Sequence, residues 1–402
     1  MNNKYKQTEI GLIPSDWEVK RLGDIGFFKK GKGIRKDEVF PDGLPCIRYG
    51  ELYTRHNEYV KKINSFISQN VAKESQRIAK GDILFAGSGE TREEIGKCAA
   101  FLSDKETYAG GDIVILSPKN CDSLFLGFLL NDSIIAKQKA QNGQGDAVVH
   151  IYPNGLSRIL LPIPPTLAEQ TAIATALSDA DGLITSLEKL IAKKRNIKQG
   201  AMQELLRPKE GWVVKRLGEI GEVIIGLTYK PENVSNDGVL VLRSSNIQYD
   251  QLEFIDNVYV NINVSEKLRL KENDILICVR NGSRDLIGKC ALITSKVKGE
   301  SFGAFMSVFR SPLNRYVIHV FRSDIVKKQI EEYLGATINQ ITNKSLNSFE
   351  IPFPPPNEQL AIATILSDMD TELTTLEKKL EKAKQLKQGM MQQLLTGKIR
   401  LV

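Results

Sequence analysis

The chain has 402 residues, enough for two or three domains, and its 42% apolar and 26% charged residues are typical of a globular protein. Lys and Arg outnumber Asp and Glu by 55 to 48, an excess that permits nucleic-acid binding without requiring it. No stretch reaches the roughly 18 apolar residues of a membrane span, and the five cysteines form no CxxC pair, so we expect a cytoplasmic protein with reduced thiols and no membrane contact.

The N-terminal region contains a segment that the chain uses twice. WEVKRLGDIG at residues 17–26 returns as WVVKRLGEIG at residues 212–221, with eight of ten letters in common. Three more segments return in the same order: 81–101 as 273–293, 161–181 as 351–370, and 198–206 as 387–395. This self-similarity predicts two copies of one structural unit in tandem.

Each copy continues through short strands into a helical segment. Runs rich in β-branched and aromatic residues, bounded by Gly, Asn or Ser, predict strands at 81–86, 97–102, 110–117, 273–279, 289–294 and 304–310. Residues 123–140 and 314–334 space their apolar residues as a helix does. We therefore predict an α+β fold with two tandem mixed α/β domains, at residues 1–165 and 207–355.

A Pro-rich junction ends each domain, at residues 162–165 and 352–356, and a long helical region follows it, at residues 166–206 and 356–402. Thr166 and Asn357 are placed to cap these helices. Apolar residues follow alternating steps of four and three, which is the heptad pattern of a coiled coil. The stripe consists of Ile173, Leu177, Ile184, Leu187, Ile191, Ile362, Leu366, Leu373, Leu376 and Leu380.

Each helix would be about 57 Å long at 1.5 Å per residue, which exceeds the width of a small domain. A stripe could pack on its own domain alone, but this length favours pairing of the two helices. We expect an antiparallel coiled coil that separates the two domains in a pseudo-two-fold, circular arrangement.

The sequence offers no catalytic or metal-binding constellation. His56, His150 and His319 lie far apart, without the spacing of metal ligands or of a nucleophilic triad. The Gly-Lys-Cys segments at 96–98 and 288–290 lack the rest of a phosphate-binding loop. We therefore expect that the chain is not an enzyme and that it binds no metal or cofactor.

Function is expected where the two copies differ, because a matched framework with changed loops is typical of a scaffold with two reading surfaces. Arg, Asn and Gln in these loops carry donors that recognise base edges in a major groove, although each could also belong to a solvated polar loop. Lys and Arg of residues 29–36 could follow phosphates or form a mobile solvated loop. The candidate DNA-binding residues are Lys30, Lys32, Arg35, Arg48, Tyr49, Ser88, Thr91, Arg92, Gln144, Arg243, Ser244, Asn246, Arg280, Asn281, Arg284, Asn339 and Gln340.

The repeated motifs resemble those of one known family. These are Trp-x-x-x-x-Leu-Gly-(Asp/Glu)-Ile, then Pro-(Ile/Phe)-Pro-Pro followed by Glu-Gln and Leu-Ser-Asp-x-Asp, and KQGMMQQLLTGKIRL at 387–401. In duplicate and end to end, they resemble the specificity (S, or HsdS) subunits of type I restriction-modification enzymes over essentially the full chain. The first copy departs from the last motif after Leu206, where the chain runs on into the second domain.

The resemblance implies a subunit that binds a bipartite double-stranded DNA target, with one half-site for each recognition domain, in defence against foreign DNA. It implies partners as well: two modification subunits that methylate adenine with S-adenosylmethionine, and restriction subunits that use ATP and Mg. Those cofactors are expected on the partners. The alternative function is a stand-alone DNA-binding regulator with a bipartite operator.

Overall fold

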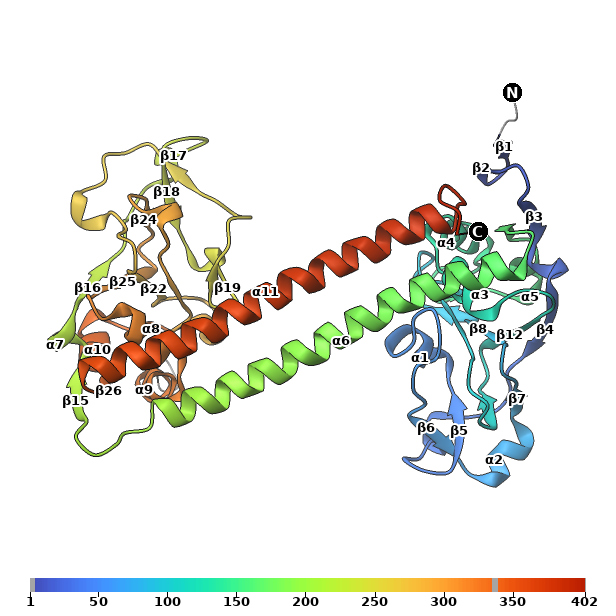
Figure 1. Ribbon diagram of the computed structural model, residues 1–402, viewed down its shortest axis with the longest axis horizontal. Coiled ribbons are helices and arrows are strands. Elements are labelled where there is room, and N and C mark those ends of the chain that lie inside the picture. Colours follow the sequence, from blue (N-terminus) through green and yellow to red (C-terminus); the bar gives the residue numbers. More distant parts are fainter. Residues whose placement is uncertain (1–3, 335–338, 402) are drawn as a thin grey trace. The chain divides into compact units, whose positions relative to one another are not determined.

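The computed structural model of the chain describes residues 4–334 and 339–401 and divides into two compact units. Unit 1 consists of Met1–Glu188 and Lys378–Val402, and unit 2 of Lys189–Glu377. Each unit holds one of the repeated domains and part of both long helices, α6 (Leu167–Leu205) and α11 (Pro356–Leu394) (Figure 1).

The core of unit 1 is an antiparallel sheet with a second small sheet beside it. The first has the order β10 (Cys98–Ala100), β8 (Ile83–Ala86), β12 (Ile113–Pro118), β4 (Gly26–Lys30). The second has the order β6 (Ser65–Ile67), β5 (Leu44–Ile47), β11 (Thr107–Ala109), β7 (Gln76–Ile78). The shorter elements are β1 (Tyr5–Thr8), β2 (Gly11–Pro14), α1 (Tyr49–Thr54), α2 (Gln69–Glu74), β9 (Ser88–Gly89), β13 (Val149–His150) and α5 (Pro153–Ser157).

Unit 2 repeats this plan. Its first sheet has the order β16 (Glu222–Ile225), β25 (Met306–Arg310), β22 (Ile275–Cys278), β23 (Cys290–Leu292). Its second has the order β17 (Val234–Ser235), β21 (Tyr259–Val260), β18 (Val239–Leu242), β24 (Ser301–Phe302). Shorter elements are α7 (Leu217–Ile220), the hairpin β19 (Ile247–Gln248) and β20 (Gln251–Leu252), and α10 (Asn343–Ser348). The predicted mixed α/β character of both domains is confirmed.

The two predicted helical segments each break into two helices. Unit 1 has α3 (Ser123–Leu129) and α4 (Ser133–Asn142), and unit 2 has α8 (Asn314–Arg322) and α9 (Asp324–Leu334). At the breaks, a carboxylate oxygen of Asp132 accepts from the backbone N–H of Ile134 at 2.9 Å, and the hydroxyl of Ser323 accepts from that of Ile325 at 3.3 Å. These side chains satisfy free N–H groups and so start a new helix where the apolar spacing alone suggested continuity.

Cys98 and Cys290 are buried at equivalent positions, the first residues of β10 and β23. Burial raises the pKa of each thiol to about 11. A thiol with so high a pKa stays protonated and unreactive at neutral pH, so both act as small apolar residues of the core.

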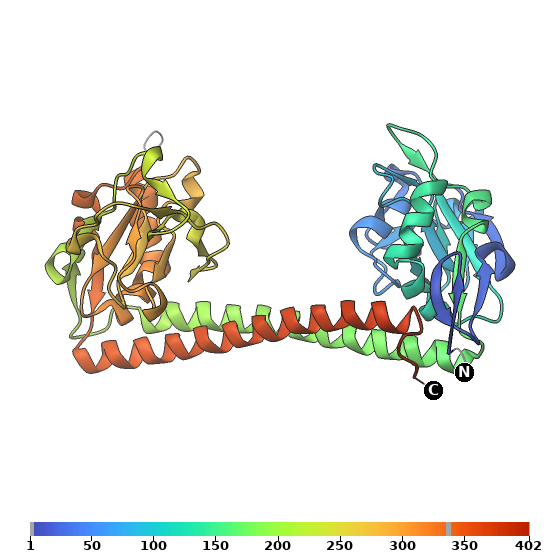
Figure 2. The same cartoon turned by 90° about the horizontal axis from the view of Figure 1, so that it is seen from above.

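Helices α6 and α11 lie side by side and run antiparallel within each unit (Figures 1 and 2). In unit 1, Lys387 forms an ion pair with Asp181 at 2.9 Å and Lys384 with Glu188 at 3.1 Å, so numbers rise on one helix as they fall on the other. All ten residues of the predicted stripe are buried or half-buried. The stripe's ends also pack on the domains: Ile173 and Leu177 share a core with Trp17, and Ile362 and Leu366 with Leu217.

The helix ends follow the local sequence. Thr166 caps α6 as predicted, because its hydroxyl accepts from the backbone N–H of Glu169 at 3.2 Å. The expected cap by Asn357 is wrong, since α11 already begins at Pro356, whose missing N–H is harmless in a first turn. Helix α11 ends at Leu394, short of the predicted 402, and Gly397 follows with a left-handed φ of 69°.

The duplicated opening segment lies against the helices in both units. Its strand β3 (Glu18–Arg21) pairs with β14 (Leu160–Ile163) in unit 1, and β15 (Val213–Arg216) pairs with β26 (Glu350–Phe353) in unit 2. The amide of Gln138 exchanges two hydrogen bonds with Leu160, at 2.9 and 3.0 Å, and Gln329 does the same with Glu350, at 2.8 Å each. The strand that leads into each long helix is therefore held on both sides.

The repeated Glu-Gln pair at the start of each long helix closes this arrangement. Glu169 binds Arg400, whose guanidinium also lies over the Trp17 ring, 5.8 Å from its centroid. Glu358 accepts hydrogen bonds from Lys209 at 2.9 Å and from the Trp212 indole at 2.8 Å, and these lower its pKa. The neighbouring Gln170 and Gln359 donate to the carbonyls of Pro164 and Pro354 at 3.2 and 2.7 Å. We use the name mount for this group of contacts in each unit. It consists of the strand pair, the Trp of the opening segment and the Glu-Gln pair.

Unit 1 ties its domain to the helix pair through Lys387. The ammonium lies 2.7 Å from Glu58 of the domain and 2.9 Å from Asp181 of α6. All three side chains are at most 14% exposed. Burial alone would lower the pKa of Lys387, but the two carboxylates outweigh it and raise the pKa above its ordinary value.

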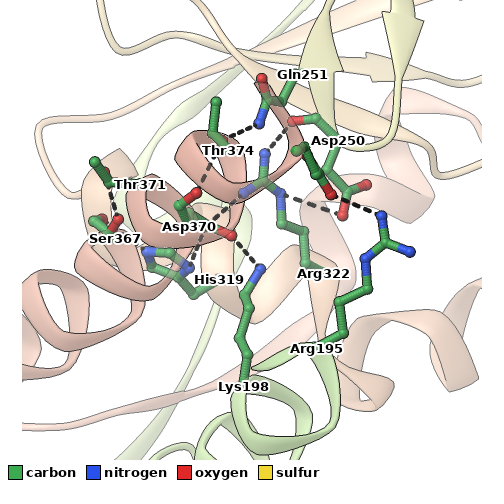
Figure 3. A network of polar contacts seen from close by, with 11 residues as sticks. Arg195, Lys198, Asp250, Gln251, His319, Arg322, Ser367, Asp370, Thr371 and Thr374 are labelled. Atoms are coloured by element: carbon green, nitrogen blue, oxygen red, sulfur yellow. Dashed lines mark hydrogen bonds and ion pairs between the residues drawn. The ribbon is translucent and has the colours of Figure 1, made fainter. Parts of the chain in front are cut away.

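Unit 2 has the equivalent lysine and aspartate with a different third partner (Figure 3). Lys198 of α6 pairs with Asp370 of α11, and Arg322 of α8 donates to Asp370 at 3.2 Å. Arg322 also donates to the backbone carbonyl of Asp250 in the β19–β20 hairpin. Burial lowers the pKa of the adjacent His319 to about 4, so its ring is neutral at neutral pH and bonds the Ser367 hydroxyl at 3.2 Å.

Within residues 4–334 and 339–401, no helix combines the length and the low polarity that crossing a bilayer requires.

Replacing Lys387 with Met is expected to lower the free energy of unfolding by about 3 kcal/mol, because it leaves two buried carboxylates without their cation. The matched control is Lys384→Ala, which removes a half-exposed pair with Glu188 and should cost less than about 1 kcal/mol. Chemical denaturation followed by circular dichroism measures both. Equal losses for the two variants would show that the Lys387 site is no stronger than a surface ion pair.

Candidate DNA interface

Three segments that differ between the copies meet in unit 1: the loop after β9, the loop before β13 and the start of helix α1. The Arg92 guanidinium donates to the carbonyls of Gly143 and Gly145 at 3.1 and 3.0 Å and lies 3.4 Å from the Asp146 carboxylate. Arg92 therefore joins the loop after β9 to the loop before β13, which projects away from the helices (Figure 2). Its donors are partly used in this contact, while Thr91 and Gln144 are exposed beside it.

Ser88 is not suited to contact DNA, contrary to the prediction. Its side chain is 5% exposed, and its hydroxyl lies 2.9 Å from Nδ1 of His150. The Tyr53 hydroxyl donates to its backbone carbonyl at 3.1 Å. Ser88 instead helps to hold β9 against β13.

The predicted basic residues Lys30, Lys32 and Arg35 are exposed. They lie at the end of the first sheet where strand β4 ends and strand β12 begins. The backbone N–H of Gly31 donates to Ile113 at 2.7 Å, and that of Lys32 to Ala109 at 3.2 Å. Strand β8 stops at the same end, because Ala86 pairs with Ile113. The sheet thus brings the basic segment and the loop of Arg92 to one side of the domain.

Arg48 and Tyr49 open helix α1 in unit 1. The backbone N–H of Arg48 donates to the Glu51 carboxylate at 3.0 Å, which fixes the start of the helix. Tyr49 is exposed, and Arg48 is half-buried. Tyr53, one turn further along α1, makes the hydrogen bond to Ser88, so this segment also belongs to the group of loops.

In unit 2 the aligned segment is organised by residues that were predicted to read DNA. Asn246 is fully buried, and its amide donates to the carbonyls of Glu253 and Asp256 and to the Asn257 side chain at 3.0 to 3.3 Å. It is therefore a loop-forming residue with no group left for DNA, and this prediction is wrong. The Arg243 guanidinium is engaged by the Asp256 carboxylate at 2.7 Å.

The other predicted residues of unit 2 do come together. The Asn281 amide donates to the Ser244 hydroxyl at 3.1 Å, and Arg280 forms a backbone bridge with Gln340. Asn339 is exposed beside Gln340. Arg284, which aligns with Arg92, is exposed and lies 3.5 Å from the backbone carbonyl of Glu331.

Sequence reasoning missed the exposed apolar residues near these loops. Phe305 is 58% exposed and lies under Arg280, with the guanidinium 5.1 Å from the ring centroid. Tyr249, at the tip of the β19–β20 hairpin, is 88% exposed. The alignment carried a signal for Phe305, because Gly-Gly-Asp precedes the strand in the first copy and Gly-Ala-Phe precedes it in the second.

In the ranges that the structure describes, His, Cys, Asp and Glu side chains do not gather in groups of three that could hold a metal ion. The surfaces formed by the divergent loops include exposed Arg, Asn, Gln, Thr and aromatic side chains, with acidic residues among them. These residue types bind nucleic acid through hydrogen bonds and stacking.

Comparison with known proteins identifies the repeated unit. The model of the family described as "Type I restriction modification DNA specificity domain" matches twice, at residues 14–199 and 209–388. The chain is 30% identical to the MjaX specificity subunit of a type I restriction enzyme from Methanocaldococcus jannaschii, over 99% of this chain and 97% of that one. It is 27% identical to the MjaVIII specificity subunit of the same organism, over 99% and 96%.

The fold agrees with this comparison. A crystal structure of the S subunit of a type I restriction-modification system from M. genitalium covers 98% of this chain and 99% of its own, with a TM-score of 0.64 at 17% identity. The chain therefore belongs to the family of type I restriction-modification specificity subunits, the non-catalytic subunits that give such systems their DNA sequence specificity.

Proposed function

We propose that the chain binds a bipartite double-stranded DNA target, with one half-site read by each unit. The observation that carries this proposal is that both units have one backbone framework and different exposed side chains on the matching loops. Two identical readers would require identical loops, whereas two different half-sites require different ones.

Exposed Lys and Arg position each unit on the phosphates, and the divergent loops contact base edges in the major groove. Lys30, Lys32 and Arg35 have the exposure that phosphate contacts need. The target adenine leaves the stack to reach a partner's pocket, because the atom to be methylated is out of reach inside the duplex.

The helices dock two modification subunits, one on each unit. Support comes from Ile197 and Leu386, which directly precede the repeated Lys-Gln-Gly and are 46% and 59% exposed. Both residues occupy equivalent positions, directly before the lysine that pairs with an aspartate in their unit. An exposed apolar residue at the same place in each unit offers two equivalent contacts to two copies of one partner.

The modification subunits carry S-adenosylmethionine, and restriction subunits that join the complex use ATP and Mg. This chain then contributes recognition and assembly alone.

Replacing residues 207–355 with the corresponding domain of another specificity subunit should change one half of the methylated sequence and leave the other half intact. The measurement is adenine methylation across the genome of cells that express the chimera with the modification subunit of its system. A change in both halves, or in neither, would overturn the two-reader proposal.

Ile197→Asp and Leu386→Asp should each remove one of two modification subunits from the complex, because a carboxylate in an apolar contact cannot be desolvated without loss of affinity. The double variant should retain none. Ile255→Asp, at an exposed loop position of unit 2, serves as the control and should retain both. Native mass spectrometry of the purified complexes counts the subunits, and full assembly of the double variant would place the docking site elsewhere.

A further inference from the structure

Three segments of unit 2 meet at one point, which we call the tip node. The backbone N–H groups of Val279 and Arg280 both donate to the carbonyl of Phe305 at 3.1 Å. The N–H of Ile341 donates to the carbonyl of Val279 at 2.8 Å, and Arg280 bridges Gln340. These bonds fix three side-chain positions next to one another: 280, 305 and 340.

Unit 1 has an equivalent node that shares two of these backbone hydrogen bonds and the strand pairing. The N–H of Gly87 donates to the carbonyl of Asp112 at 2.7 Å, and the N–H of Ile151 donates to the carbonyl of Gly87 at 2.9 Å. Ser88 pairs with His150. In the repeat alignment Ser88 matches Arg280, and Asp112 and Phe305 each stand one residue before the strands β12 and β25.

The side chains at the node differ at all three positions. Unit 1 has Ser88, Asp112 and His150 there, with Ser88 buried and bonded to His150, whereas unit 2 exposes Arg280, Phe305 and Gln340. In unit 2 the bonds of the node are made by backbone atoms alone. There the groups that hold the loops together are therefore separate from the side chains that the loops expose.

Arg280 differs from Arg92 and Arg243 in having its guanidinium donors free. Within the described part of the chain, no carboxylate lies at ion-pair distance from Arg280 and no group accepts from its guanidinium. Arg243, in contrast, is engaged by Asp256, and Arg92 by Gly143 and Gly145. The Phe305 ring stacks with the Arg280 guanidinium and limits its orientations, while leaving its edge open.

We propose that the tip node of unit 2 determines the sequence specificity of that unit, and that Arg280, held on Phe305, reads a guanine of the half-site. This proposal rests on the proposed function and names a base contact within it. A planar guanidinium donates two hydrogen bonds to O6 and N7 of guanine in the major groove, which the other bases do not accept in this pattern. Phe305 keeps the fork in place and lowers the entropy lost on binding.

The test uses the complex of the full chain with its modification subunits and reads the methylated sequence across a genome. Arg280→Ala and Phe305→Ala are the main variants. Arg280→Lys keeps the charge but loses the planar fork, so it also covers the case in which Arg280→Ala fails to fold. Lys215→Ala is the control, because Lys215 lies 4.5 Å over the Phe353 ring in the same unit but at the mount.

The expected result for the wild type is a guanine in the half-site assigned to unit 2. Both Arg280 variants should lower the preference for that guanine by about 5- to 150-fold. Phe305→Ala should lower it in the same direction, and the other half-site should stay unchanged. Lys215→Ala should methylate the wild-type sequence.

A half-site without guanine, or an Arg280→Lys variant with unaltered preference, would overturn the assignment of Arg280. If an Arg280 variant lost base preference in both half-sites, the claim that the node acts only on the half-site of its own unit would be overturned. Absence of sequence-specific methylation by the wild-type complex would instead refute the proposed function.

Discussion

The register between the two long helices depends on a lysine and an aspartate that pair once in each unit, with side chains at most 28% exposed. An apolar stripe favours helix association but allows sliding by a heptad, whereas a buried charge leaves its partner unpaired in every other register. Lys387 meets Asp181 in unit 1, and Lys198 meets Asp370 in unit 2. Each domain then adds one group to the pair, Glu58 or Arg322, so that the placement of the domain follows from the placement of the helices.

The duplicated sequence is explained by contacts that point inward. The repeated Trp, the Glu-Gln pair and the clamping Gln138 and Gln329 all hold a domain to its helices. The surrounding contacts are nevertheless not identical. Trp212 donates to Glu358, while Arg400 from the chain's C-terminal segment covers Trp17 and binds Glu169. The glutamate at the start of each long helix thus has a different cation. In unit 2 it is Lys209, which precedes strand β15, and in unit 1 it is Arg400, which follows helix α11.

Much of this organisation could be predicted from the sequence. A repeated sequence folds into a repeated unit, and a heptad of apolar residues places them on one face of a helix. The helices, their pairing and the anchoring role of the opening segment follow from such patterns. The roles of Ser88 and Asn246 did not, because their burial depends on His150 and on residues 253–257, whose positions only the folded chain determines. Phe305 escaped notice because an aromatic residue beside a strand is usually part of a core, and its exposure is set by the surrounding loops.

Backbone bonding at the tip node has an evolutionary consequence. The backbone hydrogen bonds of the node do not involve the side chains at positions 280, 305 and 340, so the effect of a substitution there on folding stays small. Mutations there can persist in a population without loss of folded protein, and, under the proposal that the node reads DNA, each one tests a new half-site. Selection on such a gene would therefore act on recognition and assembly separately, with rapid drift at the node and slow change at the mount.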